Sequence, residues 1–181
     1  MHIRKSIRLE GFDYSRPGAY FVTICSHERG DAFGEIRNGQ IELNPIGHII
    51  GRRWQWLPEQ YDHIELDEWL IMPDHLHGIV YILNDSSGIS GGGGVLSCSG
   101  VSRDATIRPS KSKSLGSLID TFKTISTKKI NEISDAPGMI IWQRNFYEHI
   151  IRDEFELNHI RDYIINNPLR WELDNGNPSK S

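Results

Sequence analysis

Residues 68–83 constrain the fold most strongly, because they hold two apolar runs separated by Pro73 and Asp74. Both runs are short and rich in Ile, Leu, Val and aromatic residues, which is typical of buried strands. The sequence therefore predicts two strands, over residues 63–72 and 75–83, on either side of the Pro-Asp break.

The second of these strands begins with His75, Leu76 and His77. Because side chains alternate along a strand, the two histidines share one face and Leu76 points to the other. Two imidazoles side by side on a rigid strand form half of a binding site for a divalent metal ion. A pair of solvent-facing histidines at the start of a strand is the alternative, and these residues alone do not decide between the two interpretations.

The chain of 181 residues fits a single domain over 1–181, with no room for two full domains. No apolar run approaches the length of a membrane span, and the first residues lack the apolar core of a signal peptide. Cys25 and Cys98 form no C-x-x-C pair, which favours a reduced, cytoplasmic setting. The net charge of −4 is unfavourable for coating nucleic acid, although a local basic face is enough for binding.

Turn and cap signals separate the other elements. Asn38 and Gly39 fit the tight type I′ turn of a hairpin, and Asn44 and Pro45 fit the N-cap and first residue of a helix. In chain order, the first expected elements are a strand over 20–27, a hairpin over 33–43, a helix from 45 to Pro58, and strands over 63–72 and 75–83. A helix over 115–133 and a strand over 140–147 that continues towards Arg152 follow. The last expected helix begins at the capping box of Asp153 and Glu156 and ends at Asn167 and Pro168.

Residues 84–113 differ sharply in composition, with six glycines and eight serines. This composition predicts a flexible linker or loop. The glycines at 91–94 do not form a phosphate-binding loop, because neither the Walker spacing nor its Lys-Ser/Thr follows. Residues 170–181 are expected to form a tail.

Without the hairpin, the order of elements is βαββαβ, the ferredoxin-like arrangement of an antiparallel sheet with two helices on one face. We therefore expect an α+β fold with an inserted hairpin and an additional C-terminal helix. The strand that carries His75 and His77 would be an inner strand. The additional helix would be free to cover the other face of the sheet, where a site can form.

The additional helix carries His159, Tyr163 and Asn167 at four-residue spacing, so that they roughly share a face. A helical tyrosine is most often a packing residue. Phenol is a poor nucleophile at neutral pH, but it becomes useful against a phosphodiester when a metal ion polarises the phosphate. The pair His75 and His77 with Tyr163 on a separate element would supply that combination.

His75-Leu76-His77 is the signature of HUH endonucleases, and residues 163–168 resemble their single-tyrosine helix. More narrowly, the chain resembles the REP-associated tyrosine transposases, relatives of the insertion-sequence-200-like transposases. Besides the tyrosine helix, the resemblance covers four blocks that follow in order, at residues 18–25, 68–78, 114–123 and 142–152.

This resemblance implies an HUH fold that cleaves and rejoins single-stranded DNA through a 5′-phosphotyrosine intermediate. Tyr163 would attack the scissile phosphate and leave a free 3′-OH. His75 and His77 would hold Mg²⁺ or Mn²⁺, and Asn167, four residues after the tyrosine, would be the third ligand.

The resemblance also implies a DNA hairpin with a short single-stranded guide sequence as the ligand. Residues 103–129 contain seven basic and two acidic residues, a local net charge of +5. This charge fits either a solvated helix face or a phosphate-binding surface. The family includes dimers and monomers, and we expect a cytoplasmic protein associated with the nucleoid. The candidate DNA-binding residues are Lys123, Lys128, Lys129, Arg4, Lys5 and Arg8.

Two other functions stay open on the sequence. One is a non-catalytic, ferredoxin-like module that binds single-stranded nucleic acid, although the aromatic pattern of RNA-recognition domains is not evident. The other is a metal-dependent hydrolase that uses water and forms no covalent intermediate. Tyr147 is expected at a strand end near the DNA, and Tyr20 and Tyr81 are expected to pack within strands.

Overall fold

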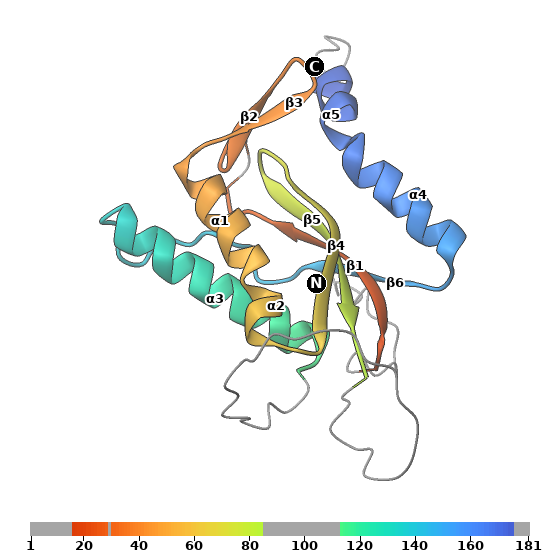
Figure 1. Ribbon diagram of the computed structural model, residues 1–181. Coiled ribbons are helices and arrows are strands. Elements are labelled where there is room, and N and C mark those ends of the chain that lie inside the picture. The colour runs from red at the N-terminus through yellow and green to blue at the C-terminus, as the bar shows by residue number, and fades with distance from the viewer. Residues whose placement is uncertain (1–15, 29, 85–112, 176–181) are drawn as a thin grey trace, which may run out of the picture.

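A four-stranded antiparallel sheet organises the protein (Figure 1). The computed structural model describes residues 16–28, 30–84 and 113–175. Neighbouring strands follow the order β4-β5-β1-β6, and each pair is antiparallel. The expected α+β class with an antiparallel sheet is therefore confirmed, and the histidine strand is an inner strand. The four strands are β1 (Gly18–Cys25), β4 (Ile64–Ile71), β5 (His75–Ile82) and β6 (Tyr147–Ile151).

Helices cover both faces of this sheet (Figure 1). Two long helices pack against each other on one face, and each follows a strand and leads back into the sheet. Two helices at the C-terminal end of the described chain lie on the other side. The helices are α1 (Pro45–Gln55), the short α2 (Leu57–Gln60), α3 (Leu115–Ile133), α4 (Glu154–Ile165) and α5 (Asn167–Asn175).

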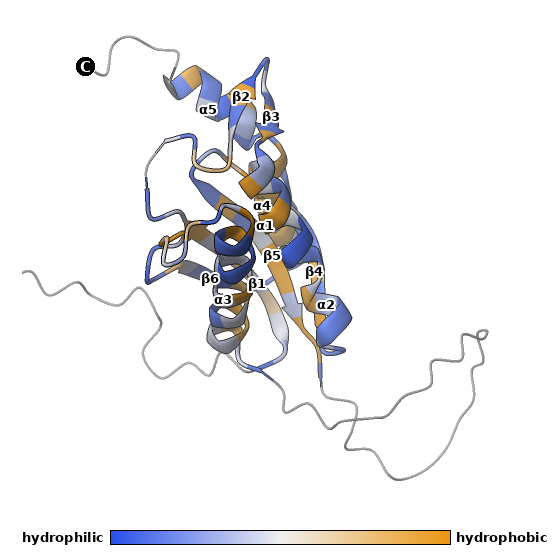
Figure 2. Cartoon of the chain, turned by 90° about the vertical axis from the view of Figure 1, so that its left-hand side faces the viewer, coloured by the Kyte–Doolittle hydropathy of each residue, from blue (hydrophilic) through white to orange (hydrophobic). Residues whose placement is uncertain are grey.

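The larger core lies between the sheet and helices α1 and α3, where apolar residues concentrate in Figure 2. Leu76 and Val80 of β5 are fully buried there, together with Trp54 and Phe122 of the two helices. Burying a side chain of this size contributes about 1.5–3 kcal/mol. This face therefore fixes the register of β5, because a slip of one residue would turn Leu76 away from the core.

A smaller core covers the opposite face of the sheet. Phe21 of β1, Ile79 of β5 and Ile164 of α4 are buried in it, and Leu157 and Ile160 pack on its edge. The alternation of β5 thus places His75 and His77 on the face that α4 covers, as the sequence predicted.

The predicted caps and the predicted turn are present. The Asn44 side chain accepts a hydrogen bond of 2.9 Å from the amide of Gly47, and Asp153 accepts one of 2.8 Å from Glu156. The hairpin of β2 (Gly34–Arg37) and β3 (Gln40–Leu43) turns at Asn38 and Gly39, whose φ angles of 54° and 71° fit a type I′ turn.

Two predicted boundaries were wrong. The last strand begins at Tyr147 and not at Ile140, because Ile141 and Trp142 are buried against the large core in irregular backbone. Asn167 and Pro168 do not end the helical region but begin α5, where a proline in the first turn costs no hydrogen bond. Residues 170–175, which were expected to be part of a tail, are therefore helical.

Several expectations concern residues outside the described ranges. These are residues 85–112 of the loop expected over 84–113, the basic residues Arg4, Lys5 and Arg8, and residues 176–181. Within the described ranges, no helix is long and apolar enough to cross a membrane.

The close approach of Trp54 to Gly78 predicts a measurable packing limit beside the histidines. A Cβ atom on Gly78 would lie 2.7 Å from Cζ2 of the fully buried Trp54. Gly78→Ala should therefore lower the free energy of unfolding by about 1–3 kcal/mol, as overpacking usually does. Urea unfolding measures this change.

Gly51→Ala in α1 is the matched control, because its nearest neighbour, Cδ1 of Ile71, would be at an ordinary 3.4 Å. That variant should be neutral or slightly stabilising, since alanine favours a helix. Equal stability of Gly78→Ala and the wild type would contradict the packing of Trp54 on β5.

Candidate active site

His75 and His77 lie side by side at the start of β5, on the face that α4 covers. Their Nε2 atoms are 2.9 Å apart, and their ring centroids are 4.4 Å apart. His77 is 4% exposed, so its ring is almost fully enclosed. The two imidazoles therefore form one unit in which the Nε2 atoms face each other.

Each imidazole is held by a hydrogen bond at its other nitrogen. Nδ1 of His75 lies 2.6 Å from a carboxylate oxygen of Asp74, and Nδ1 of His77 lies 2.9 Å from the hydroxyl oxygen of Thr23. The Asp74 carboxylate accepts a hydrogen bond from Nδ1–H of His75, which leaves the lone pair of that ring on Nε2. This is the arrangement in which protein imidazoles bind metal ions, with the second nitrogen fixing the ring.

The electrostatics of the pair also suit a metal ligand. Burial, with a smaller effect of neighbouring His75, lowers the pKa of His77 to about 3. His77 is therefore neutral at pH 7, and neutral imidazole is the form that binds metals. Two lone pairs that face each other need a cation or a shared proton between them.

The spacing of the nitrogens is short enough for both to bind one ion. Two ligands about 2.1 Å from an ion lie about 3.0 Å apart at a right angle and about 3.4 Å apart in a tetrahedron. The observed separation is 2.9 Å. Burial and the nearby Asp74 raise the pKa of the Cys25 thiol.

Tyr163 of α4 lies directly over His77. Its hydroxyl oxygen is 3.5 Å from Nε2 of His77, and the ring centroids are 5.3 Å apart. The ring packs edge-on against Phe21 at 6.1 Å, and Phe21 in turn stacks on His77 at 5.4 Å. The hydroxyl contact is too long for a strong hydrogen bond, so the hydroxyl lies close to the histidines and remains available to another partner.

A hollow of about 680 Å³ opens beside these residues. Asn167, the first residue of α5, is buried at its wall with 7% exposure. The structure thus brings together His75, His77, Tyr163 and Asn167, the predicted catalytic and metal-binding residues. The residues that line the hollow are Thr23, Cys25, His75, His77, Tyr163, Asn167, Arg170, Trp171 and Asp174.

Within the described residues, no group of three or more His, Cys, Asp or Glu side chains is placed to hold a metal ion. His75 and His77 would therefore need a ligand of another type, and Asn167 on the same hollow can supply a carbonyl oxygen. Hard divalent ions accept such an oxygen ligand.

The chain itself holds α4 and α5 over the sheet. The Nε atom of Arg161 lies 3.1 Å from both carboxylate oxygens of Asp67 on β4. At the far end, the turn at Gly39 contacts Leu169 of α5 so closely that a Cβ atom on the glycine would lie 2.4 Å from the leucine. The inserted hairpin therefore supports α5, and Tyr163 reaches the histidines of its own chain.

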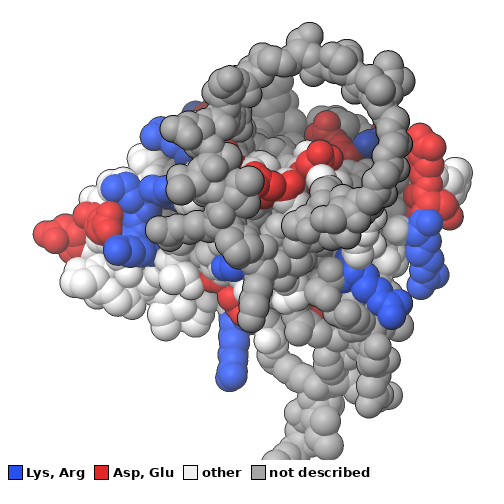
Figure 3. Space-filling model, turned by 60° about the horizontal axis from the view of Figure 1, so that its bottom comes forward, with Lys and Arg blue, Asp and Glu red and all other residues white. Residues whose placement is uncertain are grey.

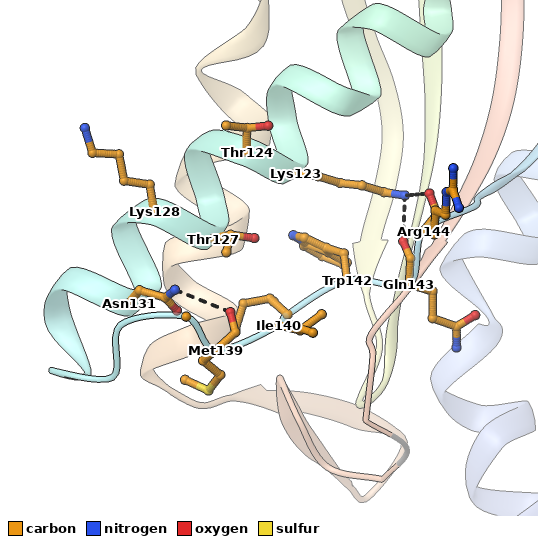
Figure 4. Close-up of a pocket in the computed structure, with 12 residues that line it drawn as sticks. Lys123, Thr124, Thr127, Lys128, Asn131, Met139, Ile140, Trp142, Gln143 and Arg144 are labelled. Carbon is orange, nitrogen blue, oxygen red and sulfur yellow. Dashed lines mark hydrogen bonds between the residues drawn. The ribbon is translucent and has the colours of Figure 1, made fainter.

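Lys123 does not have the position expected of a phosphate-binding residue. Figure 4 shows its side chain extending from α3 to the segment before β6, where its ammonium donates to the carbonyl oxygens of Gln143, Arg144 and Asn145 at 2.9–3.2 Å. Burial lowers the pKa of Lys123. The side chain therefore holds this segment in place.

The other two described lysines of the predicted DNA-binding set lie on α3, which Figure 1 shows across the sheet from α4, the helix of Tyr163. Lys128 is exposed at a second hollow of about 560 Å³, and Lys129 lies 3.3 Å from Glu132. Among the described residues visible in Figure 3, basic and acidic side chains are interspersed and form no single basic patch.

Two of the other tyrosines that the sequence raised make different contacts. Tyr20 is buried, and its hydroxyl donates to the carbonyl of Arg16 at 2.7 Å. Tyr147 packs edge-on to Phe21 from β6, with ring centroids 6.2 Å apart. Tyr163 is the described tyrosine whose ring and hydroxyl both contact His77.

The sequence did not predict several residues of the site, which are Thr23, Cys25, Asp74, Arg170, Trp171 and Asp174. Asp74 had a signal, since it directly precedes the first histidine. Arg170 and Trp171 follow Tyr163 at spacings of seven and eight residues, which continues the same helical face only if the helix does not end at Pro168.

Comparisons with known proteins give a relative by sequence and a solved structure with a similar fold. No protein-family model matches the chain. An uncharacterized protein of Haemophilus influenzae is 39% identical over 180 residues, and the match covers 96% of this chain and 93% of the relative. The solved structure of a REP-associated tyrosine transposase bound to a REP hairpin has a TM-score of 0.53 and 16% identity, and the match covers 92% of this chain and 73% of the other.

The ion pair between Asp67 and Arg161 predicts how the attachment of α4 depends on pH. Burial alone would raise the pKa of Asp67, but hydrogen bonds from Arg161 and the amide of Glu68 outweigh it and lower the pKa. The carboxylate thus stabilises the folded protein in full above about pH 5, and this contribution is lost as the pH falls through the lowered pKa.

Asp67→Asn should therefore be less stable than the wild type at pH 7, and the difference should shrink below about pH 4. Urea unfolding of both proteins from pH 2.5 to 7 measures it. A difference that stays constant over this range would show that the charge of Asp67 does not anchor α4.

Proposed function

Because the chain belongs to one family with the Haemophilus influenzae protein and shares its fold with a REP-associated tyrosine transposase, we propose that it is a DNA transposase that cleaves and rejoins single-stranded DNA. The observation that carries the proposal is the hydroxyl of Tyr163, 3.5 Å from Nε2 of His77 and beside the convergent histidine pair. The strand order β4-β5-β1-β6, with α1 and α3 on one face, supports a ferredoxin-like fold of the HUH type.

In the proposed reaction, Tyr163 is the nucleophile. Its hydroxyl oxygen forms a bond to the scissile phosphorus, and the bond from phosphorus to the 3′ oxygen breaks. The phenolic proton is released to solvent, and the leaving 3′ oxygen takes up a proton. The products are a 5′-phosphotyrosine and a free 3′-OH, and a 3′-OH can reverse the step and join new ends without ATP.

We propose Mg²⁺ or Mn²⁺ as the cofactor. His75 and His77 would hold the ion through Nε2, and Asn167 would supply the third ligand from α5. The 2.9 Å spacing and the occupied Nδ1 atoms support this assignment. When bound, such an ion polarises the phosphate and stabilises the charge that develops on it.

The proposed ligand is a DNA hairpin with unpaired flanking nucleotides, like the hairpin in the structure of the similar transposase. Lys128 and Lys129 are the described candidates for phosphate contacts, and Arg4, Lys5 and Arg8 remain candidates outside the described ranges. Since Tyr163 reaches the histidines of its own chain, a monomer can hold a complete site, and a homodimer stays compatible with it. The proposed location is the cytoplasm, at the nucleoid.

Tyr163→Phe tests the nucleophile. The wild type, incubated with Mn²⁺ and a pool of hairpin oligonucleotides with random single-stranded flanks, should form a protein–DNA adduct that survives denaturing electrophoresis. Tyr163→Phe should abolish the adduct, because it removes the attacking oxygen, and should leave hairpin binding intact, because the ring that packs on Phe21 remains.

Tyr147→Phe is the matched control and should keep the adduct. Retained adduct in Tyr163→Phe would overturn the assignment. Cut DNA without an adduct would point to the hydrolase that uses water, and binding without cleavage would point to the non-catalytic module.

Removing the phosphate contacts should change the salt dependence of binding. Lys128→Ala and Lys129→Ala should each lower the slope of log K against log salt by about 1, because each lost phosphate contact releases one counterion fewer. Titrations of a fluorescent hairpin at several salt concentrations measure the slope. Arg52→Ala removes the same charge from an exposed position of α1 and should leave the slope unchanged. Equal slopes for all variants would show that α3 is not part of the DNA-binding surface.

A further inference from the structure

Helix α5 adds a cation to the hollow beside Tyr163. Arg170 is the one Lys or Arg among the described residues that line it. The guanidinium carbon lies 5.7 Å from the centroid of the Tyr163 ring, so the charge is close to the proposed nucleophile. Neither the sequence nor the comparisons assign a role to this residue.

From this placement we propose that Arg170 is a catalytic residue that binds the phosphate group attacked by Tyr163. This inference rests on the proposed function and names the side chain that would bind the negatively charged phosphate. The guanidinium presents two parallel N–H donors, a geometry that matches two oxygens of one phosphate.

The charges of the side chains around the hollow favour this role for an anionic substrate. Tyr163 and Asn167 are polar side chains without a positive charge, and the carboxylate of Asp174 lines the same hollow. A phosphodiester that enters would meet Asp174 as a repelling charge. Arg170 precedes Asp174 by four residues on α5, so the two share a helix face and the carboxylate is spaced to orient the guanidinium.

The helix geometry also places Arg170 beside the proposed metal ligand. Asn167 and Arg170 are three residues apart on α5 and therefore point to the same side. Trp171 packs near His75 with ring centroids 5.8 Å apart, which fixes this part of α5 against the histidine strand. A phosphate that reaches Tyr163 would thus lie between the histidine pair and the arginine.

In the transfer step, Arg170 would neither take nor give a proton. Its guanidinium stays protonated at any pH of interest. While the bond from Tyr163 to phosphorus forms and the bond to the 3′ oxygen breaks, negative charge grows on the non-bridging oxygens, and Arg170 stabilises that charge.

Binding of thymidine 5′-monophosphate tests the proposal without requiring cleavage. The Mg²⁺-loaded wild type should bind this nucleotide more tightly than thymidine, which lacks the phosphate. Arg170→Ala should lower the affinity for the nucleotide on the order of tenfold to a hundredfold, because a hydrogen bond to a charged group is lost. The affinity for thymidine should not change. Arg170→Lys should retain part of the affinity, because lysine keeps the positive charge but lacks the two parallel N–H donors. Calorimetry measures all of these affinities.

Two controls separate this role from a structural one. Arg170→Ala should bind Mn²⁺ as the wild type does, and Arg52→Ala, which removes an exposed charge on the other side of the sheet, should bind the nucleotide normally. The proposal is wrong if Arg170→Ala binds the nucleotide as tightly as the wild type, or if the wild type binds it no better than thymidine.

The adduct assay then separates the two proposals. On an oligonucleotide that labels the wild type, Arg170→Ala should form the adduct about 100-fold more slowly. An unchanged rate would overturn the role of Arg170 and leave the transposase intact. Nucleotide binding that depends on Arg170, in a protein that never forms an adduct, would keep the phosphate site and overturn the transposase.

Discussion

Burial of Leu76 between two histidines is the constraint on which the candidate site depends. Its side chain is fully buried in the large core, so the register of β5 cannot slip without losing that burial. The same alternation turns His75 and His77 to the opposite face, where Thr23 and Asp74 fix their rings. The core on one side of the sheet thus fixes the positions of His75 and His77 on the other side.

The second half of the site comes from the C-terminal helices, which the rest of the chain holds in place. Arg161 ties α4 to β4, and the turn at Gly39 supports α5 through Leu169. The inserted hairpin, which is not part of the βαββαβ order, therefore has a clear structural use. It steadies the helix that carries Asn167 and Arg170.

The sequence predicted the features that depend on local pattern. The histidine strand, the turn at Asn38 and Gly39, the capping box at Asp153 and the meeting of Tyr163 with His77 all follow from periodicity, cap chemistry or family resemblance. Features set by tertiary contacts were missed. Thr23 meets His77 across 54 residues of sequence, and Lys123 turned inwards to carbonyls of a segment whose apolar residues had suggested a strand. The Asn-Pro pair predicts a helix end because proline breaks helices, but proline in a first turn also begins them, as it does in α5.

The central claim is that Tyr163 becomes covalently attached to DNA beside the histidine pair. Proteolysis of the adduct, followed by mass spectrometry of the nucleotide-bearing peptide, tests it most directly. We expect a nucleotide linked through its 5′ phosphate to Tyr163 in the presence of Mg²⁺ or Mn²⁺, and no linkage when the metal is chelated. A nucleotide on Tyr147, or cleaved DNA with no modified tyrosine, would contradict it.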